Sequence, residues 1–246
     1  MEPIEIILPE TDSTNSRLRE LIREKQLAEF SFVRAEYQTA GRGQVGNSWE
    51  SERGKNLLMS FLVLPKKLDV HRQFFLSMAV SIAIVETVSE YIDNVCIKWP
   101  NDIYVGDRKL VGILIENNLR GAQIAETIVG LGLNVNQLQF VSNAPNPVSM
   151  SQITGQSYDV QTVANQIIAE AKDWIAQVNA EAWDTISSRY MSLLYRNDGA
   201  LHAFRDAQGA FRARIVSIMP DGRLVLLDEH GTQRHYFFKE VEYVLN

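Results

Sequence analysis

Residues 40–49 read AGRGQVGNSW and combine glycines at G-x-G-x-x-G spacing with one arginine, Arg42. Glycine lets backbone N–H groups approach an anion closely, and successive N–H groups can form a concave anion-binding site. The guanidinium of Arg42 adds a fixed positive charge whose planar fork matches phosphate or carboxylate. Taken alone, this stretch predicts either an anion-binding loop or a solvated surface loop.

The same glycine spacing occurs in Rossmann folds, but the surrounding sequence argues against that use. A Rossmann loop needs a helix directly after the last glycine, because the helix N-terminus binds the pyrophosphate. After Gly46 the chain continues NSWESERGKN, which is polar, interrupted by Gly54 and without an apolar period. The Lys-Ser/Thr pair of a P-loop is also missing. We therefore expect an anion loop of another kind.

Further charged residues favour the anion-binding interpretation. The stretch KWPND, residues 98–102, is expected to expose Lys98 and Trp99 at a strand end, before a rigid proline and a polar turn. The stretch DRKLVGILIEN, residues 107–117, places Lys109 at the start of a strongly apolar strand. One such lysine is usually just a solvated charge. Lysines, an arginine, a carboxylate and a glycine loop together suit a site for a phosphate and a carboxylate.

Apolar periodicity and turn residues predict the elements that must position these groups. The most apolar helix is expected over residues 71–91, and a hairpin over 101–117 turns at Gly106-Asp107. Strands and helices do not alternate regularly, so we expect an α+β fold rather than a doubly wound parallel sheet. The other strands are expected at 5–9, 30–38, 56–65, 95–100 and 126–136, with helices after residue 11 and over 161–195.

The sequence pattern changes from helix-like to strand-like near residues 196–199. Short strand-like segments follow, with turn signals at 206–209, 220–222 and 230–231. Such spacing is typical of a small all-β unit, here of about 50 residues. We therefore predict two domains, residues 1–195 and residues 196–246.

The 246 residues carry a formal net charge of −6 and are 46% hydrophobic. This charge argues against a general nucleic-acid binder, which normally has a basic surplus. The single cysteine, Cys96, lies in an apolar run and is expected to be an inert thiol. The longest apolar stretch, residues 74–88, is shorter than the roughly 20 residues of a membrane span. With no signal peptide evident, we expect a soluble, cytoplasmic protein.

Four segments resemble biotin–protein ligases in their order and spacing. They are TDSTN (11–15), AEYQTAGRGQVGNSW (35–49), KWPNDIYVGDRKLVGILIEN (98–117) and VGLGLNVN (129–136). The resemblance is strong over about residues 8–140, and KWPND combined with the GRGxxGxxW loop is specific. It implies a class II synthetase-like catalytic domain with a mixed, largely antiparallel sheet, followed by a small SH3-like β-barrel.

The resemblance also implies an activity. ATP would activate biotin to biotinyl-5′-AMP with release of pyrophosphate. The biotinyl group would then pass to a lysine of a biotin carboxyl carrier protein of a biotin-dependent carboxylase. Biotin, ATP and the carrier protein are thus the implied partners, with Mg²⁺ as the implied ion.

Individual residues take implied roles from the same resemblance. Lys109 would meet the biotin carboxylate and the α-phosphate, Arg42 would belong to a loop closing over the adenylate, and Asp102 would orient the acceptor lysine or a metal-bound phosphate. The biotin-binding positions are Ser13, Thr14, Asn15, Gln38, Arg42, Gly43, Gln44, Lys109, Gly112, Gly130 and Gly132. The ATP- or adenylate-binding positions are Gly41, Arg42, Gly43, Trp49, Lys98, Asn101 and Asn134.

These residue types fit the implied chemistry. Attack of a carboxylate on the α-phosphate brings two anions together, and Lys109, Arg42 and magnesium on the phosphates would offset the repulsion. No covalent enzyme intermediate is needed, in keeping with the lack of a Ser-His-Asp or Cys-His arrangement in the sequence. No set of protein metal ligands is expected. A loop that orders over the adenylate would exclude water from a reactive anhydride.

Two features depart from the family pattern. Gln44 stands where many of these loops carry a second arginine, so a cation is lost and adenylate retention could be weaker. The TDSTN segment begins at residue 11, which leaves no room for the winged helix-turn-helix domain of some members. We therefore expect no DNA binding. No membrane association is expected, and exposed strand edges would allow a homodimer.

Two alternatives stay open. A lipoate or octanoate transferase shares the architecture, but GRGQVG replaces its RRxxGGG-type motif and residues 1–70 contain no histidine. A non-catalytic module that docks a protein or RNA would have no need of Arg42, Lys98, Asp102 and Lys109 together. Pyrophosphate release on adding biotin and ATP distinguishes an enzyme from such a module.

Overall fold

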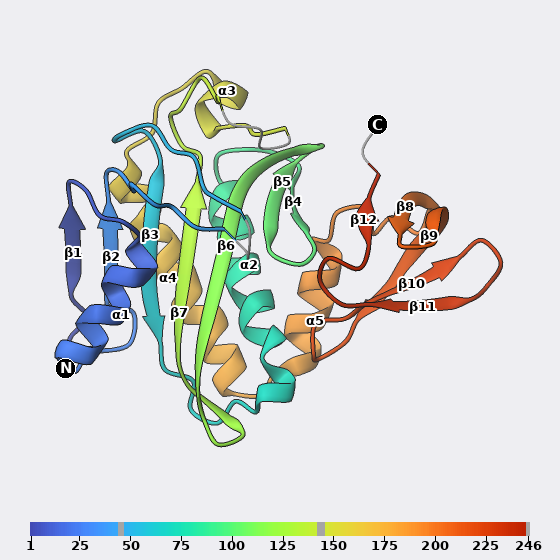
Figure 1. The fold of residues 1–246 in the computed structure, drawn as a ribbon, viewed down its shortest axis with the longest axis horizontal. Helices are drawn as coiled ribbons and strands as arrows, with labels where there is room; N and C mark the ends of the chain where they lie inside the picture. The colour runs from blue at the N-terminus through green and yellow to red at the C-terminus, as the bar shows by residue number, and fades with distance from the viewer. Residues whose placement is uncertain (44–46, 142–145, 245–246) are drawn as a thin grey trace.

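The computed structural model describes residues 1–43, 47–141 and 146–244, which form two β-sheets with helices packed against them (Figure 1). In this part of the chain the larger sheet has seven strands in the order β1-β2-β3-β7-β6-β5-β4. The first two strands pair in parallel, and all other neighbours pair antiparallel. The strands are β1 (Glu5–Leu8), β2 (Phe32–Ala35), β3 (Leu57–Val63), β4 (Val95–Lys98), β5 (Asp102–Val105), β6 (Arg108–Arg120) and β7 (Gln123–Leu133).

This arrangement confirms the α+β fold with a mixed, largely antiparallel sheet. The predicted hairpin is formed by β5 and β6, and Gly106 at its turn has a φ of 57°, which favours glycine. The longest pairing joins β6 and β7. These two strands run through the centre of the sheet and carry Gly112, Gly130 and Gly132.

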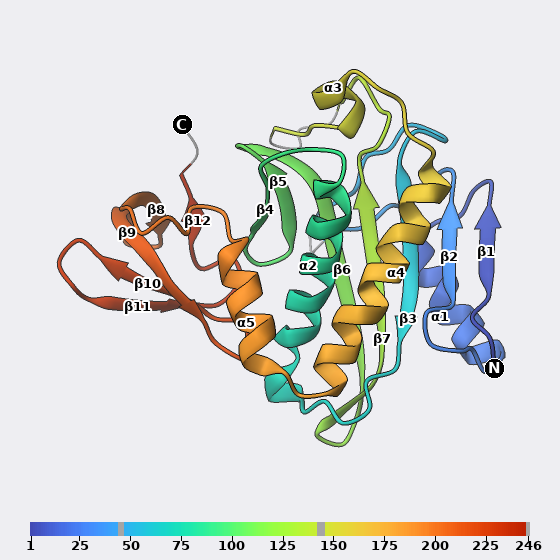
Figure 2. The ribbon, with the colours of Figure 1, turned by 180° about the vertical axis from the view of Figure 1, so that it is seen from behind.

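Helices cover both faces of the sheet. The face seen in Figure 2 carries α2 (Phe74–Ser89), α4 (Val160–Asn179) and α5 (Trp183–Ser192), whereas α1 (Thr14–Glu24) lies on the opposite face (Figure 1). Every residue of β3 is buried because this strand is covered on both faces. On the α1 face a cavity lies beside the N-terminus of this helix.

The apolar helix α2 is buried because it is hydrophobic on nearly all sides. It packs against α4, α5 and the strands of the sheet. By length and composition the segment Val70–Ser89 could cross a membrane, but 72% of its most apolar window lies inside the protein. A short 3-10 turn (Val70–Arg72) precedes the helix, so the α-helical part begins three residues later than predicted.

Other element boundaries also differ from the predictions. The helical region expected over 161–195 is two helices, since Glu181 between them has a positive φ of 55° that interrupts the helix. The strand expected over 30–38 is shorter, at Phe32–Ala35. A one-turn helix, α3 (Met150–Thr154), was not predicted; it begins with a capping box of Ser149 and Gln152.

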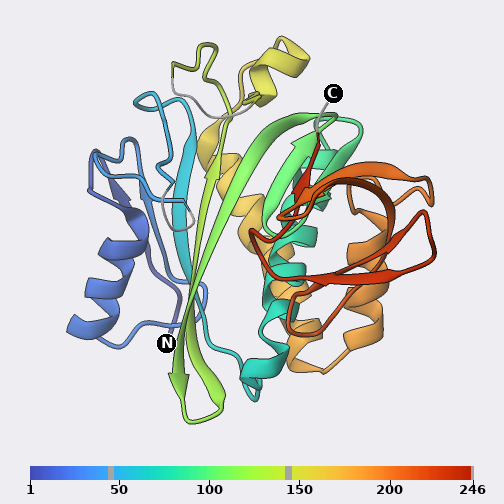
Figure 3. The same cartoon turned by 45° about the vertical axis from the view of Figure 1, so that its right-hand side comes forward.

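A second sheet follows α5, and its five strands have the order β11-β10-β9-β8-β12. It confirms the expected short strands beyond residue 196. Figure 3 shows this sheet beside the hairpin of β4 and β5, with β12 nearest to it. Its strands are β8 (His202–Asp206), β9 (Gly209–Ile218), β10 (Leu224–Asp228), β11 (Gln233–Tyr236) and β12 (Glu242–Tyr243).

Trp99 joins the second sheet to the main body. The prediction that it is exposed at a strand end is wrong, because its side chain is only 3% exposed. Its indole Nε1 donates to the carbonyl of Gly222 at 2.9 Å, and its ring meets Phe238 edge-on at 5.4 Å. Gly222 has a φ of 94°, and a Cβ there would lie 2.8 Å from the Phe74 ring. The joint therefore needs both the tryptophan and the glycine.

Replacing Trp99 by phenylalanine should loosen this joint. The variant keeps an aromatic ring but loses a buried hydrogen bond, so the free energy of unfolding should fall by about 1–3 kcal/mol. Amide hydrogen exchange in β9 and β10 should become faster. Trp174→Phe is the matched control, since its Nε1 donates to Glu86 within the main body. Equal exchange in β9 and β10 for both variants would contradict the linking role of Trp99.

Candidate active site

A cavity of about 660 Å³ lies on the α1 side of the sheet. It gathers the N-terminus of α1, the glycine loop, the turn between β4 and β5, the centres of β6 and β7, and the segment before and within β12. The predicted site residues that line it are Ser13, Thr14, Asn15, Gln38, Arg42, Gly43, Trp49, Lys98, Asn101, Asp102, Lys109, Gly112, Gly130 and Gly132. Sequence segments more than 200 residues apart therefore line one cavity.

Two glycines form part of the cavity floor. Gly112 of β6 and Gly132 of β7 are register partners. A Cβ at residue 112 would lie 2.7 Å from the Trp49 ring, and one at residue 132 would lie 2.4 Å from it. Only glycine at both positions lets the indole lie this close to the sheet. Trp49 therefore covers the sheet at these two glycines.

The glycine loop holds Trp49 by its backbone. The N–H of Trp49 donates to the Gly41 carbonyl at 3.0 Å, and the N–H of Gly43 donates to the Asn47 carbonyl at 2.9 Å. The indole Nε1 is buried and has no hydrogen-bond partner among the described residues. An acceptor on a ligand would satisfy this donor. Gln44, the predicted site residue that stands in place of a second loop arginine, lies outside the described residues.

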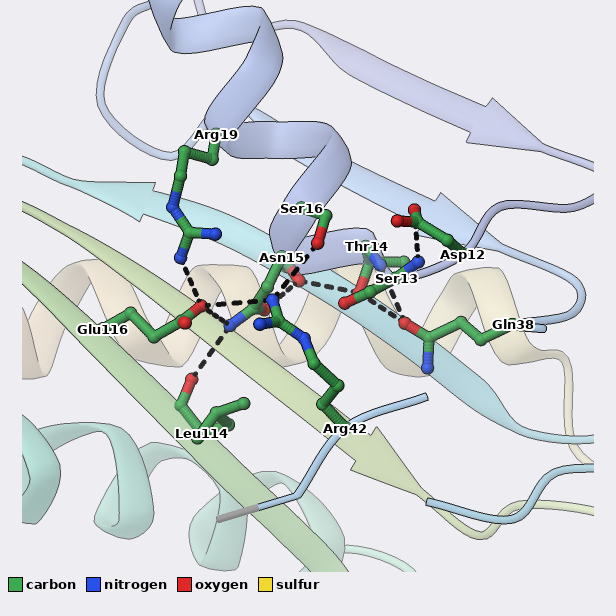
Figure 4. Close-up of polar contacts among 11 residues, drawn as sticks. Asp12, Ser13, Thr14, Asn15, Ser16, Arg19, Gln38, Arg42, Leu114 and Glu116 are labelled. Atoms are coloured by element: carbon green, nitrogen blue, oxygen red, sulfur yellow. Dashed lines mark hydrogen bonds and ion pairs between the residues drawn. The ribbon is translucent and has the colours of Figure 1, made fainter. Parts of the chain in front are cut away.

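One end of the cavity is lined mainly by uncharged hydrogen-bonding groups, with the guanidinium of Arg42 at its edge (Figure 4). Gln38 Oε1 accepts from the Thr14 backbone N at 2.8 Å and lies 3.1 Å from Thr14 Oγ1. Ser60 Oγ lies 2.7 Å from Thr14 Oγ1 and 2.5 Å from Asn15 Oδ1. A Cβ at Gly130 would fall 2.1 Å from Asn15 Oδ1, so glycine is required there. These contacts fix amide and hydroxyl groups that suit an uncharged polar ligand.

The N-terminus of α1 is positioned by its own sequence. Ser13 is the N-cap residue, but its side chain makes no capping bond. Instead, its backbone N–H donates to Asp12 Oδ1 at 2.6 Å. Because the Ser13 hydroxyl is not used for capping, it remains part of the cavity lining.

The other end of the cavity is cationic. Lys109 Nζ lies 2.7 Å from Asp102 Oδ1 and 5.9 Å from the centre of the Trp49 ring. Both partners of the ion pair are partly exposed, at 26% and 22%. Asn101 fixes the turn, since its Nδ2 donates to the Ile113 carbonyl and its own carbonyl accepts from the Ile113 N–H. This end suits an anion that competes with Asp102 for Lys109.

Lys98 lies deeper in the same region. Its Nζ donates to the Tyr104 hydroxyl at 3.2 Å and lies 5.4 Å from the centre of the Tyr243 ring. Burial lowers the pKa of Lys98, and the nearby charges of Lys109 and Arg196 lower it further against the opposing effect of Asp102. A phosphate reaching this lysine would relieve its unfavourable burial as a cation.

Two predicted residues stand behind the lining rather than in it. Asn134 is buried, and its Nδ2 donates to the Val148 carbonyl at 3.1 Å. Gly41 lies beneath Trp49, where a Cβ would be 2.8 Å from the Trp49 carbonyl oxygen. Gly41 thus supports Trp49, which lines the cavity, whereas the Asn134 side chain contacts Val148, which does not.

The sequence left one contribution to the site open and did not indicate another. The lining also includes Lys239, Val241, Glu242 and Tyr243, whereas the sequence leaves open whether Lys239 faces the site or belongs to a solvated strand face. Glu116 contacts Asn15 from outside the lining (Figure 4). The alternation of Gly112, Leu114 and Glu116 along β6 could have placed this carboxylate on the cavity face.

Cys96 plays no part in this cavity. Its thiol is partly buried, and burial raises its pKa to about 11, with Asp107 adding to the effect. The thiol therefore stays protonated near neutral pH, in keeping with an inert cysteine. The described residues also contain no group of three or more His, Cys, Asp or Glu side chains arranged to hold a metal ion.

The cavity thus offers mainly uncharged hydrogen-bonding groups at one end and the lysines Lys98 and Lys109 at the other. Comparison with known proteins gives the family. Residues 7–134 match the Biotin/lipoate A/B protein ligase family, and the chain belongs to this family.

Individual relatives agree with this assignment. The chain is 32% identical over 189 residues to the bifunctional ligase/repressor BirA of Escherichia coli (strain K12), covering 76% of this chain and 58% of that protein. It is 26% identical over 234 residues to the biotin–[acetyl-CoA-carboxylase] ligase of Paracoccus denitrificans, covering 92% and 95%. The biotin protein ligase of Aquifex aeolicus, solved in complex with biotin and ATP, superposes with a TM-score of 0.80 at 25% identity and covers 98% of this chain.

Proposed function

We propose that this protein activates biotin with ATP to form biotinyl-5′-AMP, releases pyrophosphate, and transfers the biotinyl group to a lysine of a biotin carboxyl carrier domain. The observation that carries the proposal is the two-ended cavity. Its neutral end offers the amide and hydroxyl groups of Thr14, Asn15 and Gln38, and its other end offers Lys98 and Lys109. The superposition with a ligase solved with biotin and ATP supports the same pairing of ligands.

In this proposal the ureido group of biotin lies at the neutral end. Ser13, Thr14, Asn15 and Gln38 supply both donors and acceptors, as a urea-like group requires. The glycines at 112, 130 and 132 let Trp49 and Asn15 lie against the sheet backbone, so these two side chains would border the ligand. The valeryl chain then points its carboxylate toward Lys109.

The cations serve the first chemical step. The biotin carboxylate attacks the α-phosphorus of ATP, the bond to the bridging oxygen breaks, and pyrophosphate leaves. Lys109 meets both anions, and Asp102 holds the ammonium in place before they bind. Arg42 lies at the entrance of the neutral end and belongs to the glycine loop, which would close over biotinyl-5′-AMP. Positioning and charge stabilisation supply the rate.

Magnesium fits this site as an ion carried by ATP. Mg²⁺ in proteins usually keeps several waters and uses one or two carboxylates plus substrate phosphates. Among the described residues that line the cavity, the carboxylates are Asp102 and Glu242. When bound, the ion would neutralise charge on the leaving pyrophosphate. Asp102 is our candidate ligand for it.

The second step needs the acceptor amine as a neutral nucleophile. The amine nitrogen attacks the biotinyl carbonyl carbon, AMP leaves as the anhydride bond breaks, and the nitrogen loses a proton. Asp102 lies beside Lys109 at the open end and is positioned to orient this amine. Trp49 and the loop around it would shield the anhydride from water.

We further propose that residues 1–195 form the catalytic domain and residues 196–246 a small SH3-like β-barrel. The five-stranded sheet of β8 to β12 supports the second domain. Because the segment from Lys239 to Tyr243 lines the cavity, this domain would contribute to the site itself. We place the protein in the cytoplasm, in keeping with a free Cys96.

A transfer assay tests the proposal. Purified protein, ATP, magnesium and biotin are mixed with an isolated carrier domain, and biotin on the carrier lysine is read on a blot. A parallel reaction contains lipoate, since the family includes lipoate ligases. We expect ATP-dependent labelling with biotin only. Labelling with lipoate in place of biotin, or no pyrophosphate release with either acid, would refute the proposed reaction.

A further inference from the structure

Glu116 of β6 contacts three residues beside the neutral end of the cavity (Figure 4). Its Oε2 accepts a hydrogen bond from Asn15 Nδ2 at 2.6 Å. The same oxygen lies 2.7 Å from Arg19 Nη2 and 3.8 Å from Arg42 Nη2. One carboxylate thus connects β6 with α1 and with the glycine loop.

The strand geometry explains how Glu116 reaches these partners. Successive side chains of a strand point to opposite faces, so residues 112, 114 and 116 lie on the same face of β6. This face carries the cavity. Across the ladder Glu116 pairs with Ile128, which packs into the apolar cluster beneath α1. The side chain is 28% exposed, so its charge is partly desolvated and is balanced by the arginines.

The contact with Glu116 determines how the Asn15 amide is oriented. With Nδ2 donating to the carboxylate, Oδ1 faces Ser60 Oγ at 2.5 Å and lies over Gly130. A flipped amide would place Oδ1 against a carboxylate oxygen, which is repulsive. Nδ2 also lies 3.5 Å from the Leu114 carbonyl, a much longer contact than that with Glu116.

Arg42 is held more loosely by the same carboxylate. Its guanidinium lies 3.8 Å from Glu116, 3.2 Å from Ser16 Oγ, and is 42% exposed. An exposed pair at this distance contributes little to stability. Two guanidinium groups therefore share one carboxylate, and the looser one can turn toward an anionic ligand without leaving Glu116 unpaired.

We propose that Glu116 is a positioning residue for the acid substrate. It orients the Asn15 amide toward the ligand and keeps the Arg42 guanidinium at the edge of the cavity. This inference rests on the proposed function, because it assigns Asn15 to the ureido end of biotin. Glu116 itself touches no reacting atom, so its loss should change substrate affinity far more than turnover.

The test compares Glu116→Ala with Glu116→Gln in the full chain, by steady-state pyrophosphate release with biotin varied at saturating ATP. Glu116→Ala should raise the KM for biotin about tenfold or more, the scale of one hydrogen bond to a charged group, with kcat within about threefold. Glu116→Gln keeps an oxygen that accepts from Asn15, so its KM should stay within about threefold of the parent.

Glu126 of β7 provides a matched control. It is also partly exposed, and its Oε1 accepts from an asparagine amide, Asn118 Nδ2, at 2.9 Å. This pair lies outside the cavity lining. Glu126→Ala should therefore leave the KM for biotin unchanged, while thermal unfolding reports any general loss of stability in each variant.

Exchanging the amide and the carboxylate between residues 15 and 116 keeps the proposal testable if Glu116→Ala fails to fold. Asn15→Asp places two carboxylates together and should raise the KM for biotin. Adding Glu116→Gln supplies an amide donor to the new Asp and should lower that KM by about tenfold, since the repulsion becomes a charge-assisted hydrogen bond.

The outcomes separate this inference from the proposed function. A parent chain that shows no biotin-dependent pyrophosphate release and no biotin binding by calorimetry overturns both. An active parent with an unchanged KM in Glu116→Ala overturns the role of Glu116 alone. So does an Asn15→Asp defect that Glu116→Gln leaves unrelieved. A rise in KM confined to Glu116→Ala, with recovery in the exchanged pair, supports it.

Discussion

Replacing Lys109 by methionine should lower kcat/KM for biotin-dependent pyrophosphate release by about 100-fold or more, the range found when one preorganised charge is removed from a reacting centre. Methionine retains an unbranched apolar stem, so the packing against Gly112 should persist. What is lost is the ammonium that, in the proposed reaction, would meet both the carboxylate and the α-phosphate. Asp102 would then lack its 2.7 Å partner and would repel the incoming anions.

The neighbouring cation provides the control for this prediction. Arg108 precedes Lys109 on the same strand but is exposed and does not line the cavity. Arg108→Met should keep the parent rate, and both variants should show the parent's thermal unfolding. If Lys109→Met retained more than about a tenth of the parent's kcat/KM, a loss below about 1.4 kcal/mol, Lys109 would have no central role in adenylation.

Adding one methyl group at Gly130 should raise the KM for biotin by about 30-fold or more, since overpacking of this kind costs on the order of 1–3 kcal/mol and also displaces a ligand contact. A Cβ at this position would lie 2.1 Å from Asn15 Oδ1 and 2.8 Å from its Cγ. Asn15 must move, and its contacts with Ser60 and Glu116 must break. The measurement is biotin binding by calorimetry together with KM.

A double-mutant cycle makes the Gly130 prediction specific. If Gly130→Ala acts by displacing Asn15, adding it to Asn15→Ala should cost little more than Asn15→Ala alone, because coupled residues are not additive. Ala125→Ser, at an exposed position of the same strand, controls for changes in β7. Fully additive losses would mean that the methyl group acts on something other than Asn15.

Much of the fold followed from local patterns. The apolar run of α2 and the hairpin of β5 and β6 were predictable, because periodicity and turn residues act over a few residues. The short helix α3 was not, since one turn has no measurable period. The break at Glu181 also escaped prediction, because a positive φ in a non-glycine residue leaves no clear mark in the sequence.

The lining of the cavity was predictable where its residues belong to short sequence motifs. Lys109, Asp102 and the glycines at 112, 130 and 132 do meet in one cavity. Long-range partners could not be read in the same way. The sequence around Trp99 is typical of an exposed strand end. In the fold, however, Gly222, which lies far along the chain, covers this side chain. Glu116 could be assigned to a face but not to Asn15, which comes 101 residues earlier in the chain.

The span of chain that forms the cavity has a consequence during protein synthesis. Ser13 lies on one wall and Tyr243 on another, so the ribosome must add 230 further residues before both walls exist. Contacts this distant in sequence form late, because loop closure costs entropy before any contact is gained. A nascent chain that already contains the glycine loop and both lysines would still lack part of the cavity wall. Ligand capture should therefore begin only after translation has passed the last strand.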